Sequence, residues 1–242
     1  MTYSNKPKMK IEDLSHRFGE QEVLGDISMQ VEQGQIVSIL GPSGVGKSTL
    51  FNLISGILPL QEGRIHLQGE QTGVSYMLQK DLLLEHKTVL DNVILPLILK
   101  GEGKDQARRK GMALLESFGL DQVAQTYPNA LSGGMRQRVA LMRTYMMGRD
   151  FFLLDEAFSA LDELTKLNLY QWYQDIHREL GLTTLLITHS IEEAISLSNR
   201  IYILSGKPGR ITANIEIEWD PKGDLELQKL TYVKKIRKEL GI

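Results

Sequence analysis

The sequence predicts an α/β domain with a mostly parallel sheet, an antiparallel β subdomain near its N-terminus and an inserted helical lobe. Short apolar runs alternate with helical segments in the second half of the chain, which favours parallel strands buried on both faces. Residues 9 to 33 instead alternate apolar and polar positions, as antiparallel strands often do. The stretch from 88 to 147 has a helical pattern and separates two groups of predicted strands.

Glycines divide the first half of the chain into its predicted elements. We expect turns near Gly19 and Gly25 within residues 9 to 33. The apolar run Ile36–Leu40 predicts a buried strand, and a second β segment is expected at about 63 to 78.

The predicted lobe contains two helical stretches. The pattern from Thr88 to Leu120 is helical, with an interruption at 101 to 105. Ser132 is a candidate N-cap for a further helix that runs to Met147 and stops at Gly148.

The second half of the chain alternates strands and helices. The expected elements are a strand at Phe151–Leu154, a helix from Asp162 to Leu180, a strand at Thr184–Thr188, a helix at Ile191–Leu197 and a strand at Arg200–Leu204. A strand and an amphipathic helix at about 224 to 241 follow. We therefore expect a single domain over 9–242, with a core at about 9–87 and 148–218 and a lobe at about 88–147.

The composition of the chain excludes some classes of protein and of site. Hydrophobic residues make up 42% of the 242 residues and charged residues 24%, which is typical of a globular domain. The net charge of -2 lacks the basic excess of a general nucleic-acid binder, so no nucleic-acid partner is expected. The chain contains no cysteine, which excludes disulfides and thiolate metal sites.

Neither a secretory signal nor a membrane span is expected. The N-terminal residues lack an apolar run with a small-residue cleavage site. The most apolar stretch, Val89–Leu99, is too short to cross a bilayer and contains Asp91, Asn92 and Pro96. We expect a cytoplasmic protein whose membrane association comes through a partner.

A phosphate-binding pattern follows the predicted strand at Ile36–Leu40. It matches G-x-x-x-x-G-K-[ST] and opens a helix predicted at Lys47–Ile54, which is the structural context that the pattern requires. The alternative is a glycine-rich turn that binds nothing, which the flanking strand and helix disfavour. Backbone N–H groups would contact phosphate oxygens, with the Lys47 ammonium beside them and the Ser48 hydroxyl on Mg²⁺. The predicted loop consists of Gly41, Pro42, Ser43, Gly44, Val45, Gly46, Lys47, Ser48 and Thr49.

Three polar side chains follow buried strands and should meet at one edge of the sheet. Asp155 and Glu156 come after Phe151–Leu154, and His189 comes after Thr184–Thr188. We expect Asp155 to hold Mg²⁺, Glu156 to act as general base, and His189 to bind the γ-phosphate. The alternatives are helix caps for the carboxylates and a packing or surface role for the histidine.

Together, these motifs resemble the ATP-binding cassette (ABC) ATPases over nearly the whole chain. The resemblance rests on the segments GPSGVGKST, LSGGM and FFLLDE, on Asp162 at the end of SALD, and on His189. Without it, Ser132 and the two glycines after it could be only an N-cap. The resemblance implies ATP as the bound nucleotide and Mg²⁺ as the metal.

The resemblance also implies further site residues. Phe18 stands where the family has an aromatic that stacks on adenine, and Gln79 where a glutamine contacts Mg²⁺ and the attacking water. Ser132, Gly133 and Gly134 match the signature that binds the γ-phosphate held by the opposite subunit, and Asp162 matches a residue that links the two sites. Met135 replaces the usual glutamine, which removes one side-chain hydrogen bond.

The resemblance implies a homodimer closed by two ATP molecules, because each chain supplies only part of each site. Residues 79 to 98 resemble the groove in which membrane-spanning permease subunits dock, and Ser205–Ile211 resembles importers of nitrate, sulfonate, taurine and pyrimidine precursors. This implies a place at the cytoplasmic face of the membrane and an extracytoplasmic solute-binding protein. The alternatives are an exporter motor and a soluble ABC ATPase that acts on DNA or the ribosome.

Overall fold

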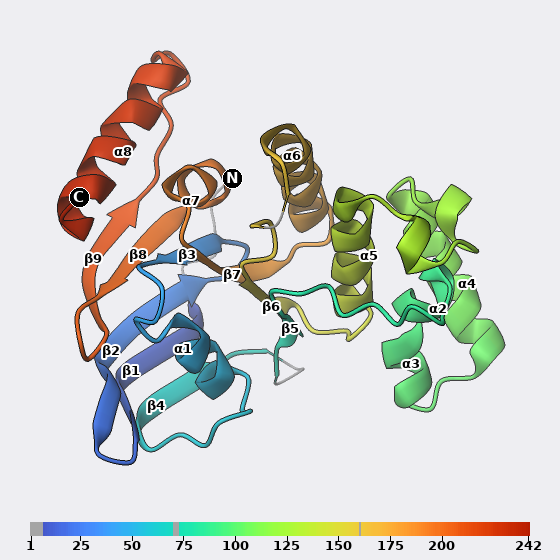
Figure 1. The fold of residues 1–242 in the computed structure, drawn as a ribbon, viewed down its shortest axis with the longest axis horizontal. Coiled ribbons are helices and arrows are strands. Elements are labelled where there is room, and N and C mark those ends of the chain that lie inside the picture. The colour runs from blue at the N-terminus through green and yellow to red at the C-terminus, as the bar shows by residue number, and fades with distance from the viewer. Residues whose placement is uncertain (1–6, 70–72, 160) are drawn as a thin grey trace.

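The computed structural model describes residues 7–69, 73–159 and 161–242, which form two sheets with helices around them (Figure 1). The smaller sheet is antiparallel and has the order β2 (Gln21–Glu32), β1 (Pro7–Phe18), β4 (Glu62–Leu67). The turn near Gly19 is confirmed, with a φ of 59° at this residue.

The turn predicted near Gly25 is wrong, because Gly25 lies inside β2. Its N–H donates to the Gly209 carbonyl at 3.0 Å. A Cβ at this position would come within 3.1 Å of the Pro208 and Arg210 side chains. The glycine therefore marks a close approach between two segments that are distant in sequence.

The larger sheet has the order β5, β6, β7, β3, β8, β9, and neighbouring strands are parallel except for the β8–β9 pair. This confirms the mostly parallel sheet. The β segment predicted at 63 to 78 is divided between the two sheets, since β4 belongs to the small sheet and β5 to the large one. The strand bounds are Ser75–Met77 for β5, Phe151–Asp155 for β6, Thr183–Thr188 for β7, Ile36–Leu40 for β3, Arg200–Ser205 for β8 and Arg210–Glu216 for β9.

Strand register brings four strand ends to one edge of this sheet. Leu40 pairs with Thr188, Asp155 with Ile187, and Met77 with Leu154. The residues that follow β3, β5, β6 and β7 therefore emerge beside one another, at the edge where open α/β sheets bind ligands.

The helices are α1 (Lys47–Ile54), α2 (Val89–Val93), α3 (Leu95–Leu99), α4 (Lys104–Ser117), α5 (Gly133–Tyr145), α6 (Glu163–Glu179), α7 (Ile191–Leu197) and α8 (Leu225–Leu240). Helices α2 to α4 gather at one end of the molecule, and α5 lies between them and the sheet (Figure 1). The helical pattern predicted from Thr88 contains one more break than expected. It falls at Ile94, where Pro96 in the first turn of α3 lacks the N–H that would continue the hydrogen-bond ladder.

Two hydrophobic clusters hold the layers together. One fills the space between the small sheet, α1 and the adjacent face of the large sheet, around Leu24, Phe51 and Leu153. The other joins the opposite face to α6, α5 and the lobe, around Phe158, Tyr173 and Val139. Tyr173 is 1% exposed, as expected of a packing residue. The parallel strands are therefore covered on both faces.

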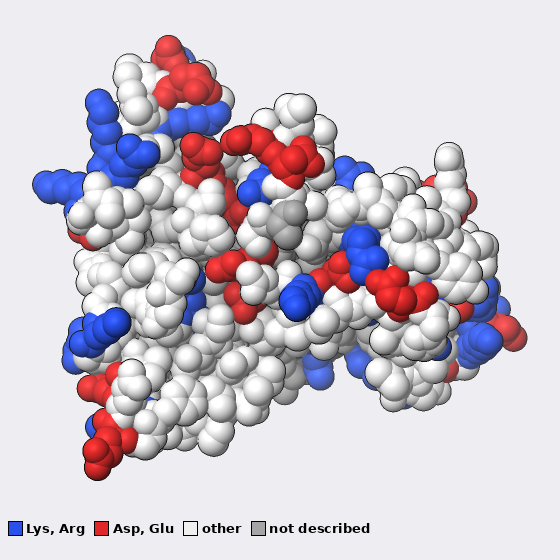
Figure 2. All heavy atoms as spheres, viewed as in Figure 1, with Lys and Arg blue, Asp and Glu red and all other residues white. Residues whose placement is uncertain are grey.

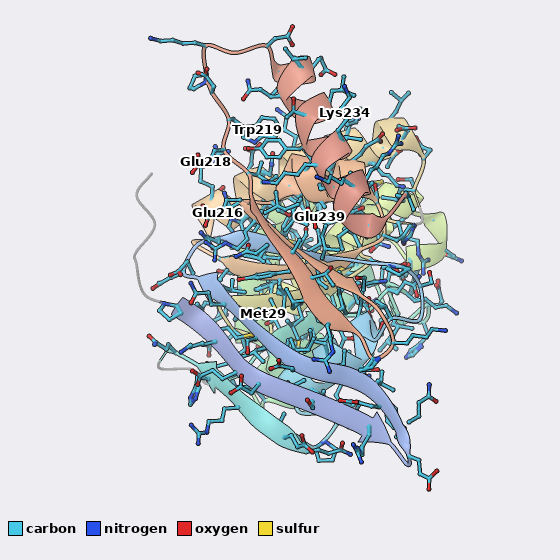
Figure 3. All side chains as sticks on the ribbon, turned by 90° about the vertical axis from the view of Figure 1, so that its left-hand side faces the viewer. Met29, Glu216, Glu218, Trp219, Lys234 and Glu239 are labelled. Carbon is cyan, nitrogen blue, oxygen red and sulfur yellow. The ribbon has the colours of Figure 1, made fainter. Side chains whose placement is uncertain are left out.

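The C-terminal helix packs on the end of the large sheet. Ile236 of α8 is fully buried among residues of α7, β8 and β9. Trp219, on the segment that joins β9 to α8, lies against α8 (Figure 3), where its ring meets Tyr232 at 5.6 Å between centroids. Basic side chains gather over α8 (Figure 2). In the described part of the chain, no helix combines the length and apolar character needed to cross a bilayer.

Candidate active site

The loop between β3 and α1 adopts a conformation that its glycines make possible. Gly44 and Gly46 have φ values of 77° and 109°, which disfavour other residues. A Cβ on Gly46 would lie 2.7 Å from Leu24, and one on Gly41 would lie 2.2 Å from the Leu204 carbonyl oxygen. Gly46 is the N-cap residue of α1. Because glycine has no side chain, no N-cap side chain accepts a hydrogen bond from the first N–H groups of this helix.

Lys47 is buried inside this loop, with 6% of its surface exposed. Its ammonium donates to the carbonyl oxygens of Gly41 at 2.8 Å and Pro42 at 2.9 Å. Burial lowers the pKa of Lys47, while the negative charges of Glu156 and Asp155 oppose the shift. A buried cation beside backbone donors forms a cradle for an anion.

Asp155 ends β6 next to the loop and is also buried. The Tyr76 hydroxyl donates to its Oδ2 at 3.3 Å. Burial raises the pKa of Asp155, and hydrogen bonds from Tyr76 and Ser48 oppose this rise. A nearby positive charge stabilises the ionised form of a buried carboxylate. Together with the Ser48 hydroxyl oxygen, the Asp155 carboxylate therefore offers the oxygen ligands that a hard cation such as Mg²⁺ prefers. Among the described residues, no group of three or more His, Cys, Asp or Glu side chains could hold a metal ion.

Glu156 lies between two polar side chains from neighbouring strand ends. Gln79 Nε2 donates to its Oε2 at 3.0 Å, and His189 Nδ1 lies 3.4 Å from its Oε1. Glu156 has a φ of 47°, uncommon for a residue with a side chain, and its N–H donates to the Ile187 carbonyl at 3.0 Å. This arrangement holds the carboxylate at the sheet edge.

The candidate signature residues form a second group at the starts of α5 and α6. Ser132 caps α5 by accepting from the Met135 N–H at 3.3 Å, and Asp162 caps α6 by accepting from the Thr165 N–H at 3.1 Å. A Cβ on Gly134 would lie 2.7 Å from Thr165. Both caps are exposed, and α5 lies beside α6, away from α1 (Figure 1).

Phe18 ends β1 with 52% of its surface exposed, and its ring meets His16 edge-on at 4.8 Å between centroids. The β1–β2 hairpin that carries it also contacts the loop, because Leu24 lies against Gly46. An exposed aromatic ring is able to stack on a planar ligand.

Sequence reasoning missed two residues, one that contacts the site directly and one that contacts the segment following Gln79. Tyr76 reaches Asp155 from β5, and Arg136 in α5 reaches Asp81 in the segment after β5. The place of Tyr76 near the end of a predicted strand was a usable signal. Nothing in the local pattern links Arg136 to a residue 55 positions earlier.

Comparisons with known proteins agree with this geometry. A family model described as "ABC transporter" matches residues 24–159. The chain is 38% identical over 224 residues to the formylaminopyrimidine import ATP-binding protein ThiZ of Halalkalibacterium halodurans, covering 91% of this chain and 89% of ThiZ. It is 40% identical over 209 residues to the taurine import ATP-binding protein TauB of Rhizobium johnstonii, covering 84% of this chain and 80% of TauB.

Solved structures show the same architecture. A dimeric ATP-binding cassette, MJ0796, in a post-hydrolysis state with ADP and Pi, superposes with a TM-score of 0.72. It is 29% identical in sequence, and the match covers 88% of this chain and all of that one.

Proposed function

Because the chain belongs to the ABC transporter family as an ATP-hydrolysing subunit, we propose that it energises the import of a small solute through separate membrane-spanning subunits. The relatives named above are import ATP-binding proteins, which favours import over the exporter and soluble ATPase alternatives. The proposed solute class is that of nitrate, sulfonates, taurine and pyrimidine precursors. The proposed place is the cytoplasmic face of the membrane, with an extracytoplasmic solute-binding protein as a further partner.

The observation that carries the proposal is the meeting of two groups at one sheet edge. Buried Lys47 lies in the loop beside Asp155, and Glu156 lies between Gln79 and His189. The first group suits phosphate and a metal, and the second suits a water molecule. Phosphoryl transfer to water needs both.

Each residue has a proposed role in hydrolysis. Backbone donors of the 41–49 loop and Lys47 bind the phosphates, and Phe18 stacks on adenine. Glu156 accepts a proton from the attacking water, while Gln79 and His189 orient that water and the γ-phosphate. Ser48, Asp155 and Gln79 hold Mg²⁺, which when bound offsets the negative charge that develops on the phosphate oxygens.

The signature residues Ser132, Gly133 and Gly134 are proposed to act on the opposite subunit. Ser132 and Gly133 are exposed, Gly134 packs against α6, and the helix α5 that they begin lies away from α1 of the same chain (Figure 1). In a two-fold dimer they would complete the partner's site, with Asp162 linking the two. The dimeric relative MJ0796 supports this arrangement.

Two variants test the proposed chemistry. Glu156→Gln is expected to keep ATP binding, stop turnover and accumulate as a dimer with ATP, because the carboxylate is removed and the cradle is kept. Lys47→Ala is expected to lose nucleotide binding itself. The measurements are nucleotide titration, phosphate release and size-exclusion chromatography, with exposed Glu179→Gln as the matched control. A Glu156→Gln variant that hydrolyses ATP at the normal rate would contradict the proposal.

The transport role has its own test. The chain should co-purify with a membrane-spanning protein, and the complex in vesicles should accumulate solute from the side opposite the ATPase only when ATP is supplied. Solute movement in the reverse direction would favour the exporter alternative.

A further inference from the structure

A short segment connects the core of the chain, where Gln79 lies beside Glu156, to the helical lobe. It runs from Gln79, whose amide contacts Glu156, to Thr88 at the start of α2. Figure 1 shows the chain cross α5 on its way from β5 to α2. What holds this segment therefore decides where Gln79 lies.

Arg136 on α5 holds the segment by its charge. Its guanidinium binds Asp81 with two hydrogen bonds, Nε to Oδ2 at 2.8 Å and NH2 to Oδ1 at 3.0 Å, and NH2 also donates to Glu85 Oε1 at 2.7 Å. The Arg136 and Asp81 side chains are only 22% and 19% exposed. The two-pronged geometry is specific to arginine, since a lysine ammonium cannot reproduce it. Hydrogen bonds from Arg136 and the Leu83 N–H lower the pKa of Asp81 against the effect of burial, so the pair stays ionised.

A second arginine on α5 fixes the backbone of the same segment. Arg143 stands seven residues after Arg136, on the same face of the helix. It donates to the carbonyl oxygens of Leu82 at 2.7 Å and of Asp81. Leu82 has a φ of 47°, a conformation that persists in a non-glycine residue when its surroundings impose it.

The far end of the segment belongs to the lobe. The fully buried side chain of Asn92 accepts from the Leu84 N–H at 2.7 Å and donates to the carbonyls of Leu84, Lys87 and Thr88. Residues 81–88 are thus fastened to α5 and α2, whereas Gln79 reaches across to Glu156 in the core.

We propose that Arg136 is a positioning residue that makes Gln79 and Ser132 of one chain parts of a single rigid unit. Ser132 lies four residues before Arg136, at the start of the helix that carries it. The inference rests on the proposed dimer, in which Gln79 serves the chain's own site and Ser132 serves the partner's. ATP captured by Ser132 in one site then shifts Gln79 in the other, which gives a physical connection between the two sites.

The connection predicts cooperative hydrolysis that depends on Arg136. We expect the wild-type chain to show a Hill coefficient approaching 2 for ATP, the number of sites, and Arg136→Ala to approach 1. Turnover should fall roughly tenfold, the usual size of a coupling between sites, while ATP affinity measured by titration stays unchanged. Asp81→Ala should behave like Arg136→Ala, and the double variant should be no worse than either, because the two side chains act as a pair.

A matched control separates this role from simple stabilisation of the lobe. Arg108 and Asp91 form an ion pair within the lobe at 2.9 Å, with both side chains 35% exposed. Arg108→Ala should lower thermal stability by less than Arg136→Ala, because it breaks a single, more exposed ion pair, and should leave cooperativity intact. The double variant Gln79→Ala with Arg136→Ala should lose less turnover than the sum of the losses in the two single variants. The reason is that Arg136→Ala alone already displaces Gln79 from its working position.

Three outcomes would overturn the inference: hyperbolic kinetics in the wild-type chain, unchanged cooperativity in Arg136→Ala, or an equal loss of cooperativity in Arg136→Ala and Arg108→Ala. The proposed ATPase chemistry is tested separately by Lys47→Ala and Glu156→Gln. If those variants behave as expected while Arg136→Ala does not, only the coupling is rejected.

Discussion

The phosphate loop and the signature segment are both glycine-rich starts of helices, yet the structure uses their glycines differently. In the loop, Gly44 and Gly46 adopt positive φ, and the chain curls around a buried lysine. In the signature, Gly134 allows α5 to approach Thr165 of α6, and Ser132 is an exposed, ordinary N-cap. The loop is a complete cradle within one chain, whereas the signature presents a surface that a second chain could complete.

The largest expected effect comes from adding one methyl group to the loop, which tests whether ATP binding depends on the loop's conformation. Gly46→Ala places a Cβ 2.7 Å from Leu24 in a backbone conformation with φ of 109°. We expect ATP binding to be lost and the free energy of unfolding to fall by about 2 kcal/mol, the usual size of such strain. Nucleotide titration and chemical denaturation measure both effects. Normal ATP affinity in this variant would mean that the loop shape is not needed for binding.

A single substitution in the signature should reduce turnover without reducing ATP binding. Ser132→Ala removes the N-cap of α5 and should lower the free energy of unfolding by about 1 kcal/mol. ATP binding to the chain should remain, because Ser132 lies outside the loop, while turnover should fall more than tenfold, since the donor to the partner's γ-phosphate is absent. Parallel titration and phosphate-release assays measure the two quantities. A loss of affinity in the isolated chain would place Ser132 in its own site.

A third prediction concerns Glu193, in the helix that follows His189, and affects stability more than activity. Glu193 of α7 is 1% exposed and accepts from the Tyr170 hydroxyl at 3.1 Å, and its Oε1 has no hydrogen-bond partner among the described residues. Burial raises the pKa of Glu193 from 4.5 to about 7, against the hydrogen bond from Tyr170. The folded chain therefore keeps this proton more tightly than the unfolded chain does.

The sign of the pH effect follows from that difference. The stabilisation is fully present below pH 4.5 and is lost as pH rises through about 7, since the folded state binds more protons in this window. Between pH 4.5 and a pH well above 7, this loss lowers the free energy of unfolding by on the order of 3 kcal/mol, and Glu193→Gln should remove it. The variant must be compared with the wild-type chain at each pH, because burial lowers the pKa of His177 to about 4 and so gives an opposite trend. An identical pH profile of unfolding in both chains would contradict the prediction.

Elements defined by local sequence were predicted well, and features that depend on distant contacts were not. The strand at Ile36–Leu40 and the helix at Lys47–Ile54 match β3 and α1, because an apolar run and a loop motif mark their ends. The cap at Ser132 and the helix start at Asp162 are also confirmed, since capping requires only the residues that follow.

The misses share one cause. Gly25 resembles a turn residue until Gly209 is placed against it, and the charge pair of Asp81 and Arg136 joins positions 55 residues apart. The meeting of Glu156 and His189 was expected from strand ends, whereas Gln79 was assigned to the site only by the family resemblance. The domain boundaries and the catalytic assignment of each site residue remain predictions.

The most direct test of the central claim mixes two chains that are each inactive. One carries Ser132→Arg and the other Glu156→Gln, and they are combined before ATP is added. If each site takes its signature from the partner, the mixed dimer contains one site with intact Glu156 and intact Ser132, so the mixture should recover ATP hydrolysis that neither chain shows alone. Activity no greater than the sum of the two separate chains would contradict the account.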